Sequence, residues 1–349
     1  MMRWIVILLV VYGFMTPATG CRYTIREIGY SELILGQYKL AMEVDTAVYT
    51  DQVKQFVNLA YVFAMDANIE YEIKYQEQKS PVIIYQNYDG LEIDRQEVMS
   101  LSEIKTALEN FMNSPLRCFI GDKVGESFAF IVCFSAKKDQ SHVKSIVDEA
   151  LVQFSRISDH LDKEVREVLV PIFINEEGIK KEVLLLKSLG VDANSHDPVC
   201  LVVYGRGRLA GPPMIGEVLT TKEMLKQLVT IGTDCECGID LNPILKTTIP
   251  FIWNEQRRQT VAVMLGFDVD HPMVLSEMAM ILSKTNSNKI NTSANISPVL
   301  ELNNDLDSIK DNVKIKDSVN EGKSILWMIA FSVLLIIGVG LFLFYRGRQ

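Results

Sequence analysis

The two ends of the chain constrain its architecture most, because both are apolar while the sequence between them is polar enough to be soluble. Residues 1–20 carry one positive charge at Arg3, an apolar run over residues 4–15 and small residues before Cys21. This is the pattern of a secretory signal peptide, and the apolar run is too short to span a bilayer. The sequence therefore predicts that the residues after it lie outside the cytoplasm.

The C-terminal end has the pattern of a membrane-spanning helix. Residues 324–345 contain no charged side chain, and the 21 residues from Ile325 to Tyr345 would form a helix about 31 Å long, which matches the hydrocarbon layer. The tail 346–349 contains two arginines, which the positive-inside rule places in the cytoplasm. We therefore expect a single-pass protein of the cell membrane, with its N-terminal ectodomain on the periplasmic side.

The residues before Cys21 carry a second signal. The run Ala18-Thr19-Gly20-Cys21 resembles the lipobox of bacterial lipoproteins, in which the cysteine becomes the first residue of the mature chain and is acylated. It departs from that family at Ala18, where leucine is commoner. The resemblance makes Cys21 a lipidation candidate, and an ordinary signal-peptidase cut at this run is the alternative.

The sequence between the ends is acidic. The whole chain carries a net charge of −9, and setting aside Arg3 and the two arginines of the tail leaves −12 for residues 21–323. Such a chain is a poor nucleic-acid binder, so we expect the membrane and proteins at it as partners, and no nucleic acid. Residues 284–323 are rich in Asn, Ser, Lys and Asp and lack aromatic side chains, which predicts a disordered tether.

Hydrophobic periodicity indicates an α/β ectodomain in which one order of elements occurs twice. The first segment has the pattern of strands at 38–45, 69–75, 82–85 and 91–94, with helices at 50–65 and 100–112. The second has the pattern of strands at 128–134, 165–174, 199–204 and 208–210, with helices at 141–157, 176–189 and 220–230. Ser100 with Glu103, and Thr220 with Glu223, have the spacing of capping boxes that begin helices.

This order of elements resembles the thioredoxin fold. The resemblance implies an α/β fold of two tandem thioredoxin-like units, each a central mixed sheet flanked by helices. Unit 1, at 21–120, is degenerate because it lacks the middle helix, and unit 2 covers 121–235. The resemblance also implies cis-prolines at Pro81 and Pro198, which lead into the third strand of each unit. These two units, followed by the C-terminal transmembrane helix, are the fold class that we predict.

The Cys-x-x-Cys motif of that family has no counterpart here. The matching positions are Lys138–Ser141 and Val48–Asp51, and neither stretch contains a thiol. Disulfide exchange requires a thiolate at a helix N-terminus, so we expect structural or binding versions of the fold. The stretches Cys21–Tyr30 and Ser114–Arg117 are also similar to uncharacterised membrane-attached proteins of planctomycete-type bacteria, which implies location and fold but no activity.

Five cysteines remain when Cys21 is set aside, and an odd number cannot all pair within one chain. Cys235 and Cys237 lie closest together in the sequence and could form a disulfide, act in redox chemistry or bind a soft metal. Their acidic neighbours disfavour the thiolate, and no histidine lies near enough in sequence to complete a metal site. Cys133 and Cys200 lie within apolar strands, where we expect inert core residues.

A glycine-flanked pair of arginines is a weak anion-binding candidate. Arg206 and Arg208 lie in the run Tyr-Gly-Arg-Gly-Arg, although a hairpin turn would explain the glycines without any ligand. Residues 236–283 have the pattern of a small extension packed on unit 2. The histidines are scattered, without the spacing of a metal site, so we expect no metal and no cofactor.

The sequence favours an extracytoplasmic, membrane-anchored binding or scaffold protein of a membrane or envelope complex. We find no constellation of catalytic residues, so the sequence favours a protein that is not an enzyme. Two alternatives stay open, both centred on Cys235 and Cys237: a thiol-redox protein and a thiol metal-binding protein.

Overall fold

The structure is a computed structural model. It describes residues 22–45, 49–77, 80–161, 163, 165, 167–193, 195, 197–234 and 241–292, with the side chains of the last helix described as far as Ser283. The predicted signal peptide, Cys21, the pair Cys235 and Cys237, residues 293–323 of the predicted tether and the apolar segment 324–345 lie outside these residues. Residues 284–292, which were predicted to belong to the disordered tether, instead form the end of the helix Pro272–Thr292. All described residues belong to one compact unit, bounded at Met1–Ser293.

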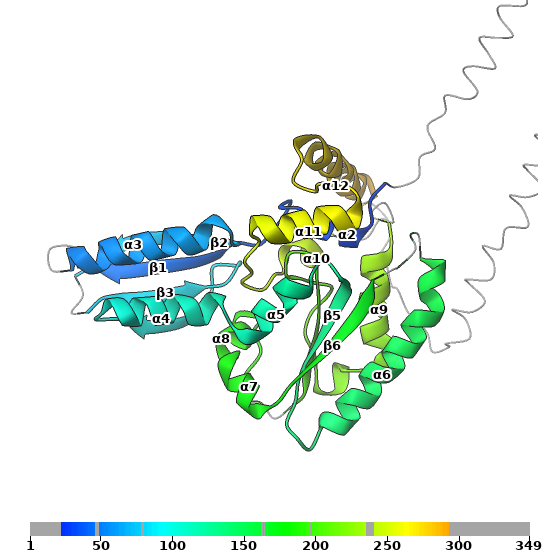
Figure 1. The fold of residues 1–349 in the computed structure, drawn as a ribbon, viewed down its shortest axis with the longest axis horizontal. Coiled ribbons are helices and arrows are strands. Elements are labelled where there is room, and N and C mark those ends of the chain that lie inside the picture. Colours follow the sequence, from blue (N-terminus) through cyan, green and yellow to red (C-terminus); the bar gives the residue numbers. More distant parts are fainter. Residues whose placement is uncertain are drawn as a thin grey trace, which may run out of the picture. The chain divides into compact units, whose positions relative to one another are not determined.

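The first sheet has four strands in the order β2-β1-β3-β4 (Figure 1). They are β1 (Tyr38–Val44), β2 (Ile69–Tyr75), β3 (Val82–Gln86) and β4 (Glu92–Glu97). β1 pairs in parallel with β2 and antiparallel with β3, and β3 pairs antiparallel with β4. Helices α3 (Thr50–Met65) and α4 (Leu101–Met112) share one hydrophobic core with the strands, so they cover one face of this sheet.

The second sheet has five strands. Four follow the order β6-β5-β7-β8, and β9 pairs with β7 beside them. They are β5 (Ser127–Phe134), β6 (Val168–Ile174), β7 (Val199–Tyr204), β8 (Arg208–Leu209) and β9 (Met214–Ile215). β5 pairs in parallel with β6 and antiparallel with β7. All eight residues of β5 are buried, which explains why its sequence is apolar without alternation.

Helices cover both faces of the second sheet. One face packs against α2 (Ile25–Gly29), α6 (Gln140–Ile157), α9 (Thr221–Gly232), α10 (Asn242–Lys246) and α12 (Pro272–Thr292). The other packs against α5 (Pro115–Lys123), α7 (Glu176–Lys181), α8 (Val183–Ser188) and α11 (Glu255–Leu265). Short 3₁₀ turns lie at Ser158–His160 and Gly216–Val218.

The beginning of the described chain belongs to the second sheet, not to the first. Tyr23, Ile25 and Ile28 are at most 1% exposed and lie in the core formed with α6 and α9. Thr24 and Glu27 make a reciprocal capping box that begins α2. In chain order, the first described residues therefore belong to the core of the second sheet, the next residues form the first sheet, and the remaining residues complete the second sheet and its core.

A buried polar network connects the first sheet to the segment after α10. The Tyr38 hydroxyl donates to the Thr248 carbonyl at 2.6 Å. The buried Asn68 amide donates to the Thr248 hydroxyl and to the Ile249 carbonyl, and its oxygen accepts from the Phe251 N–H. Because every buried polar group of Asn68 is paired, this side chain fixes the segment against the start of β2.

The fold class predicted from the sequence is wrong. The described residues form a mixed α/β structure with two sheets that are not tandem thioredoxin-like units, because residues 22–34 and helices α10–α12 complete the second core from outside 121–235. No helix within the described ranges is both long and apolar enough to cross a membrane. Periodicity reports which face of each element is buried, but not which distant elements share that core, and this is why the prediction failed.

The individual helices and strands agree better with the prediction from the sequence than the fold class does. The Ser100–Glu103 capping box is present in full, while at Thr220 the side chain accepts from the Glu223 N–H. The single helix expected over 176–189 is instead two helices, α7 and α8, separated at Glu182. The short helix α2 and the helices α5, α10 and α11 were not predicted.

The structure also corrects the expectation for two cysteines. Cys133 and Cys200 lie directly opposite each other on antiparallel β5 and β7, and they form a disulfide with Cα atoms 4.2 Å apart. Both are fully buried, so they lie in the core as expected, but they are bonded to each other. Antiparallel register brings opposed side chains this close, and the register could not be known from the sequence.

Candidate functional site

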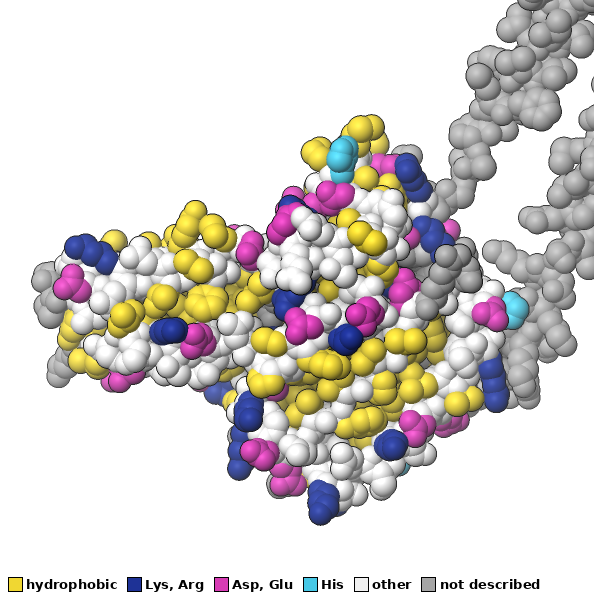
Figure 2. Space-filling view, viewed as in Figure 1, with side chains coloured by type: hydrophobic (Ala, Val, Ile, Leu, Met, Phe, Trp, Pro, Cys, Tyr) yellow, Lys and Arg dark blue, Asp and Glu magenta, His cyan; other side chains and the backbone are white. Residues whose placement is uncertain are grey.

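Strand β6 is the most exposed apolar element of the second sheet. It lies at the end of the strand order, so β5 is its one partner among the described strands. All seven of its side chains, in the sequence Val-Leu-Val-Pro-Ile-Phe-Ile, are apolar. The first and the fourth are exposed, and the other five are half-buried because they pack against the two cores of this sheet. Val168 is 62% exposed. Figure 2 shows hydrophobic side chains gathered over this part of the sheet, and surfaces of this kind mark interaction sites in soluble proteins.

The backbone of β6 limits how a partner can attach. The Ile174 carbonyl accepts from the Ser135 N–H at 3.2 Å and therefore faces β5. Because backbone groups alternate along a strand, the main chain of Pro171 faces away from β5. Proline has no N–H, which suits an open edge and removes one bond from any added strand. Contact through side chains is therefore favoured over addition of a strand.

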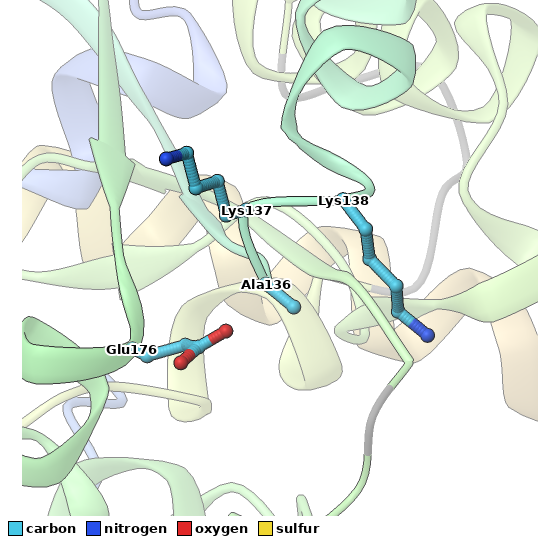
Figure 3. A pocket seen from close by; sticks show the side chains of 4 residues that line it. All are labelled: Ala136, Lys137, Lys138 and Glu176. Atoms are coloured by element: carbon cyan, nitrogen blue, oxygen red, sulfur yellow. The ribbon is translucent and has the colours of Figure 1, made fainter.

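A charged cavity adjoins the end of β6. Its volume is about 590 Å³, and it is lined by Ala136, Lys137 and Lys138 after β5 and by Glu176 at the start of α7. In Figure 3 the two lysine side chains point away from each other, and the Glu176 carboxylate points toward Ala136. Divergent ammonium groups do not converge on one anion. The cavity therefore forms a polar rim to the apolar strand, as the edges of protein interfaces do.

This cavity lies at the place where the thioredoxin resemblance would put a catalytic thiol pair. The loop from Lys138 leads into α6, whose N-cap residue Asp139 makes no side-chain capping bond. Neither this loop nor the cavity lining contains a thiol. The corresponding loop of the first sheet is described only from Tyr49 onward.

The prolines expected to be cis are both trans, since the structure has no cis peptide bond among its described residues. Each proline precedes a strand, and its carbonyl accepts a hydrogen bond from the neighbouring backbone. The Pro81 carbonyl accepts from the Val98 N–H at 2.9 Å, and the Pro198 carbonyl accepts from the Gly216 N–H at 3.0 Å. A trans proline at a strand entrance needs no special turn.

Arg206 and Arg208 do not form an anion site. They flank a hairpin turn between β7 and β8, in which Gly205 and Gly207 have φ values of 55° and 73° that favour glycine. Arg208 is 0% exposed, and its guanidinium donates to the carbonyls of Gly29, Ser31, Leu33 and Leu245. Burial lowers the pKa of Arg208 to about 10, so the group stays charged at neutral pH.

Arg206 is directed to a different partner. It forms an ion pair with Asp270 at 3.4 Å and lies over the Trp253 ring at 5.2 Å. The Trp253 indole N–H also donates to Asp270. The pKa of Asp270 is raised by burial, and the Arg206 charge opposes that rise only in part. The cluster anchors the β7–β8 turn on the segment before α11, so it has a structural role.

A second, smaller cavity of about 160 Å³ lies beside α2. Its charged residues pair with each other: Arg26 with Glu167 at 3.3 Å, and Lys163 with Glu27 at 2.6 Å. Arg26 also donates to the carbonyls of Ser127 and Phe128. These ion pairs and hydrogen bonds hold the N-terminal segment against β5, so the charged groups have a structural role.

Glu182 and Arg117 form a buried pair, at 3% and 2% side-chain exposure, with 3.8 Å between Oε2 and Nη2. Arg117 also donates to Ser114 and to the carbonyls of Asn110 and Phe111. Burial raises the pKa of Glu182, and the Arg117 charge opposes the rise only in part. The pair joins the segment between α4 and α5 to the break between α7 and α8.

The raised pKa of Glu182 predicts a pH-dependent stability. A carboxyl whose pKa is higher in the folded state contributes its full stability below the ordinary value of 4.5 and loses it as pH rises through the raised value. Wild type should therefore lose free energy of unfolding relative to Glu182→Gln as pH rises above about 4.5, because the amide does not titrate. Urea unfolding at stepped pH measures this. The exposed Glu126→Gln variant is the control, and a difference that stays flat with pH would contradict the prediction.

The residues that sequence reasoning missed share one property, which is that their partners are distant in the chain. Arg26, Arg117 and Arg208 are buried, at 6%, 2% and 0% exposure, and each has a partner far away in the chain. Their short flanking sequences carry no signal of burial. The apolar composition of β6 was visible, but only the strand order reveals that it lies at an edge.

Comparisons with known proteins give little further identification. No family model and no curated protein matches the chain. Among solved structures, it has weak similarity to human ERp44 in its zinc-bound form, a thioredoxin-family protein. The match has 10% sequence identity and a TM-score of 0.20, and it covers 60% of this chain and 60% of that one. A TM-score this low does not establish a shared fold.

Proposed function

We propose that this protein is an extracytoplasmic binding or scaffold protein, held at a membrane, whose β6 surface contacts a protein partner. The observation that carries the proposal is the apolar edge strand, with Val168 and Pro171 exposed and its other five side chains half-buried, next to a charged cavity. An apolar centre with a polar rim suits a protein surface better than a small ligand.

The location outside the cytoplasm has independent support. The Cys133–Cys200 disulfide suits an oxidising compartment, where such bonds persist. The signal-peptide pattern of residues 1–20 and the lipidation candidate Cys21 agree with export and attachment. The acidic composition of the chain favours protein over nucleic-acid partners.

Site-directed photo-crosslinking in the native membrane tests the β6 surface. A crosslinker at Val168 should give a discrete adduct, and one at Val152 on α6 should not, although the two side chains are 62% and 51% exposed. Pro171→Glu at an exposed position should abolish the adduct by placing a charge in the apolar surface, while the unfolding transition by circular dichroism stays cooperative. Ile172→Glu, at a half-buried position that packs on the core, should abolish the adduct as well and also lower the stability.

The mass of the adduct decides between partners. An adduct of twice the chain mass would identify a second copy as the partner, and another mass would identify a different protein. Equal labelling at Val168 and Val152, or an adduct that survives Pro171→Glu, would contradict the proposed surface.

A further inference from the structure

The first part of α12, from Pro272 to Ser283, exposes no charged side chain, whereas the last part of the helix contains Lys284 and Lys289. Its exposed residues between Pro272 and Ser283 are apolar or small: Pro272, Met273, Ser276, Ala279, Met280 and Ser283. Met273 is 76% exposed and Met280 is 57% exposed. The single charged residue of this stretch, Glu277, is partly buried and paired with Arg22 at 2.9 Å.

The end of α11 has a second uncharged part. Val263 is 84% exposed, and the exposed residues Gln259 and Thr260 before it are also uncharged. The connection from α11 to α12 exposes Asp268 and His271, so charged or polar side chains separate the two uncharged parts. Figure 2 shows hydrophobic side chains on the surface over α12. We call the exposed residues of 259–263 and 272–283 the α11–α12 surface.

Both chain segments that lead to the sequence-predicted membrane attachments start at α12, the N-terminal one beside Glu277 and the C-terminal one at the end of the helix, nine residues beyond the surface. At the N-terminal side, Arg22 and Tyr23 both bind the Glu277 carboxylate, at 2.9 and 2.8 Å, so Cys21 is bonded to a residue that contacts α12. At the C-terminal side, the chain leaves α12 after Thr292. Glu277 and Thr292, the two places where these segments meet α12, lie about 22 Å apart along the helix axis.

We propose that the α11–α12 surface rests on the lipid surface of the membrane. This inference depends on the proposed membrane attachment and adds which face of the protein meets the bilayer. Exposed methionine and valine on an uncharged helix face suit shallow contact with the interface, where charged side chains would resist loss of water.

Because the chain is proposed to be attached to the membrane, even a weak contact between the α11–α12 surface and lipid would be populated. A flexible segment of the length of residues 293–323 would have a root-mean-square span of roughly 30 Å. Such a link holds the surface near the bilayer at an effective concentration in the millimolar range. A few side chains would then be in contact with lipid for a large part of the time, even without a strong binding site.

Oxidative footprinting of the purified full chain in neutral phosphatidylcholine nanodiscs tests this, because methionine oxidises according to its exposure. Met65 and Met99, at 61% and 55% exposure, lie on the first sheet and its flanking elements and serve as internal controls. Met273 and Met280 should oxidise more slowly than these controls by roughly two- to threefold, which corresponds to lipid contact for half of the time or more.

A matched pair of variants distinguishes lipid contact from local protection. Met273→Glu should bring the oxidation rate of Met280 up to that of the controls, while Met65→Glu should leave Met280 protected. Equal oxidation of all four methionines in discs that carry the protein would overturn the inference and leave membrane attachment intact. Failure of the chain to remain with lipid at all would instead overturn the proposed attachment.

Discussion

Replacing Arg208 with methionine is expected to lower the free energy of unfolding by about 4 kcal/mol or more. The guanidinium donates to four main-chain carbonyls in a position with no solvent exposure. Methionine fills a similar volume but donates nothing. The Gly29 carbonyl keeps a bond from the Arg206 N–H, whereas the other three carbonyls lose this donor, and each buried carbonyl left without a partner costs about 1–3 kcal/mol. Arg208→Lys should fail similarly, because one ammonium cannot reach four acceptors arranged around a planar group.

Urea unfolding followed by circular dichroism measures the loss. The matched control is Arg156→Met on the exposed side of α6, which should change stability by less than about 0.5 kcal/mol. An Arg208→Met variant as stable as this control would show that the four carbonyls are not held by the guanidinium.

The second large effect is expected from the disulfide. Cys133 and Cys200 close a segment with a sequence separation of 67 residues, and a loop of that size corresponds to about 4 kcal/mol of stabilisation through the unfolded chain. The double variant Cys133→Ala/Cys200→Ala should therefore unfold at a much lower urea concentration. The exposed thiol variant Cys118→Ala should change little.

Mass spectrometry checks the bond itself. In denatured protein without reductant, an alkylating reagent should modify Cys118 and leave the Cys133 and Cys200 peptides linked. In native protein, both sulfurs are fully buried, so a reductant should open the bond only as fast as the protein unfolds. Free alkylation of Cys133 without reductant would contradict the assignment.

Local structure was predictable where one residue pattern decides it. β2 has the predicted bounds, and α3 covers the predicted residues 50–65. The helix at Leu101 begins at its capping box. In these elements the buried face, the caps and the flanking turns all act within a few residues of each other, so the sequence carries the information locally.

Features that depend on register or on long-range burial were not predictable. Cys133 and Cys200 become partners only because β5 and β7 are antiparallel with these two residues opposed. Arg208 is buried because residues 29–33 and Leu245 fold over it, and these are 175 or more and 37 residues away. The candidate surface on β6 likewise depends on strand order, which periodicity does not report.

The place of the first residues in the second core has a consequence for the order of folding during synthesis. Arg22 meets Glu277 across a separation of 255 residues, and Tyr23 meets it across 254. The first sheet has all of its strands and covering helices within residues 38–112, so it can form while the rest is still being made. The N-terminal segment, although synthesised earlier, gains its partners on β5, α6 and α9 only as these are made, and it lacks its last partner, Glu277, until α12 emerges. At about 5–20 residues per second, that wait lasts tens of seconds. During it, the apolar side chains of Tyr23, Ile25 and Ile28 are exposed to any chaperone of the compartment in which the chain folds.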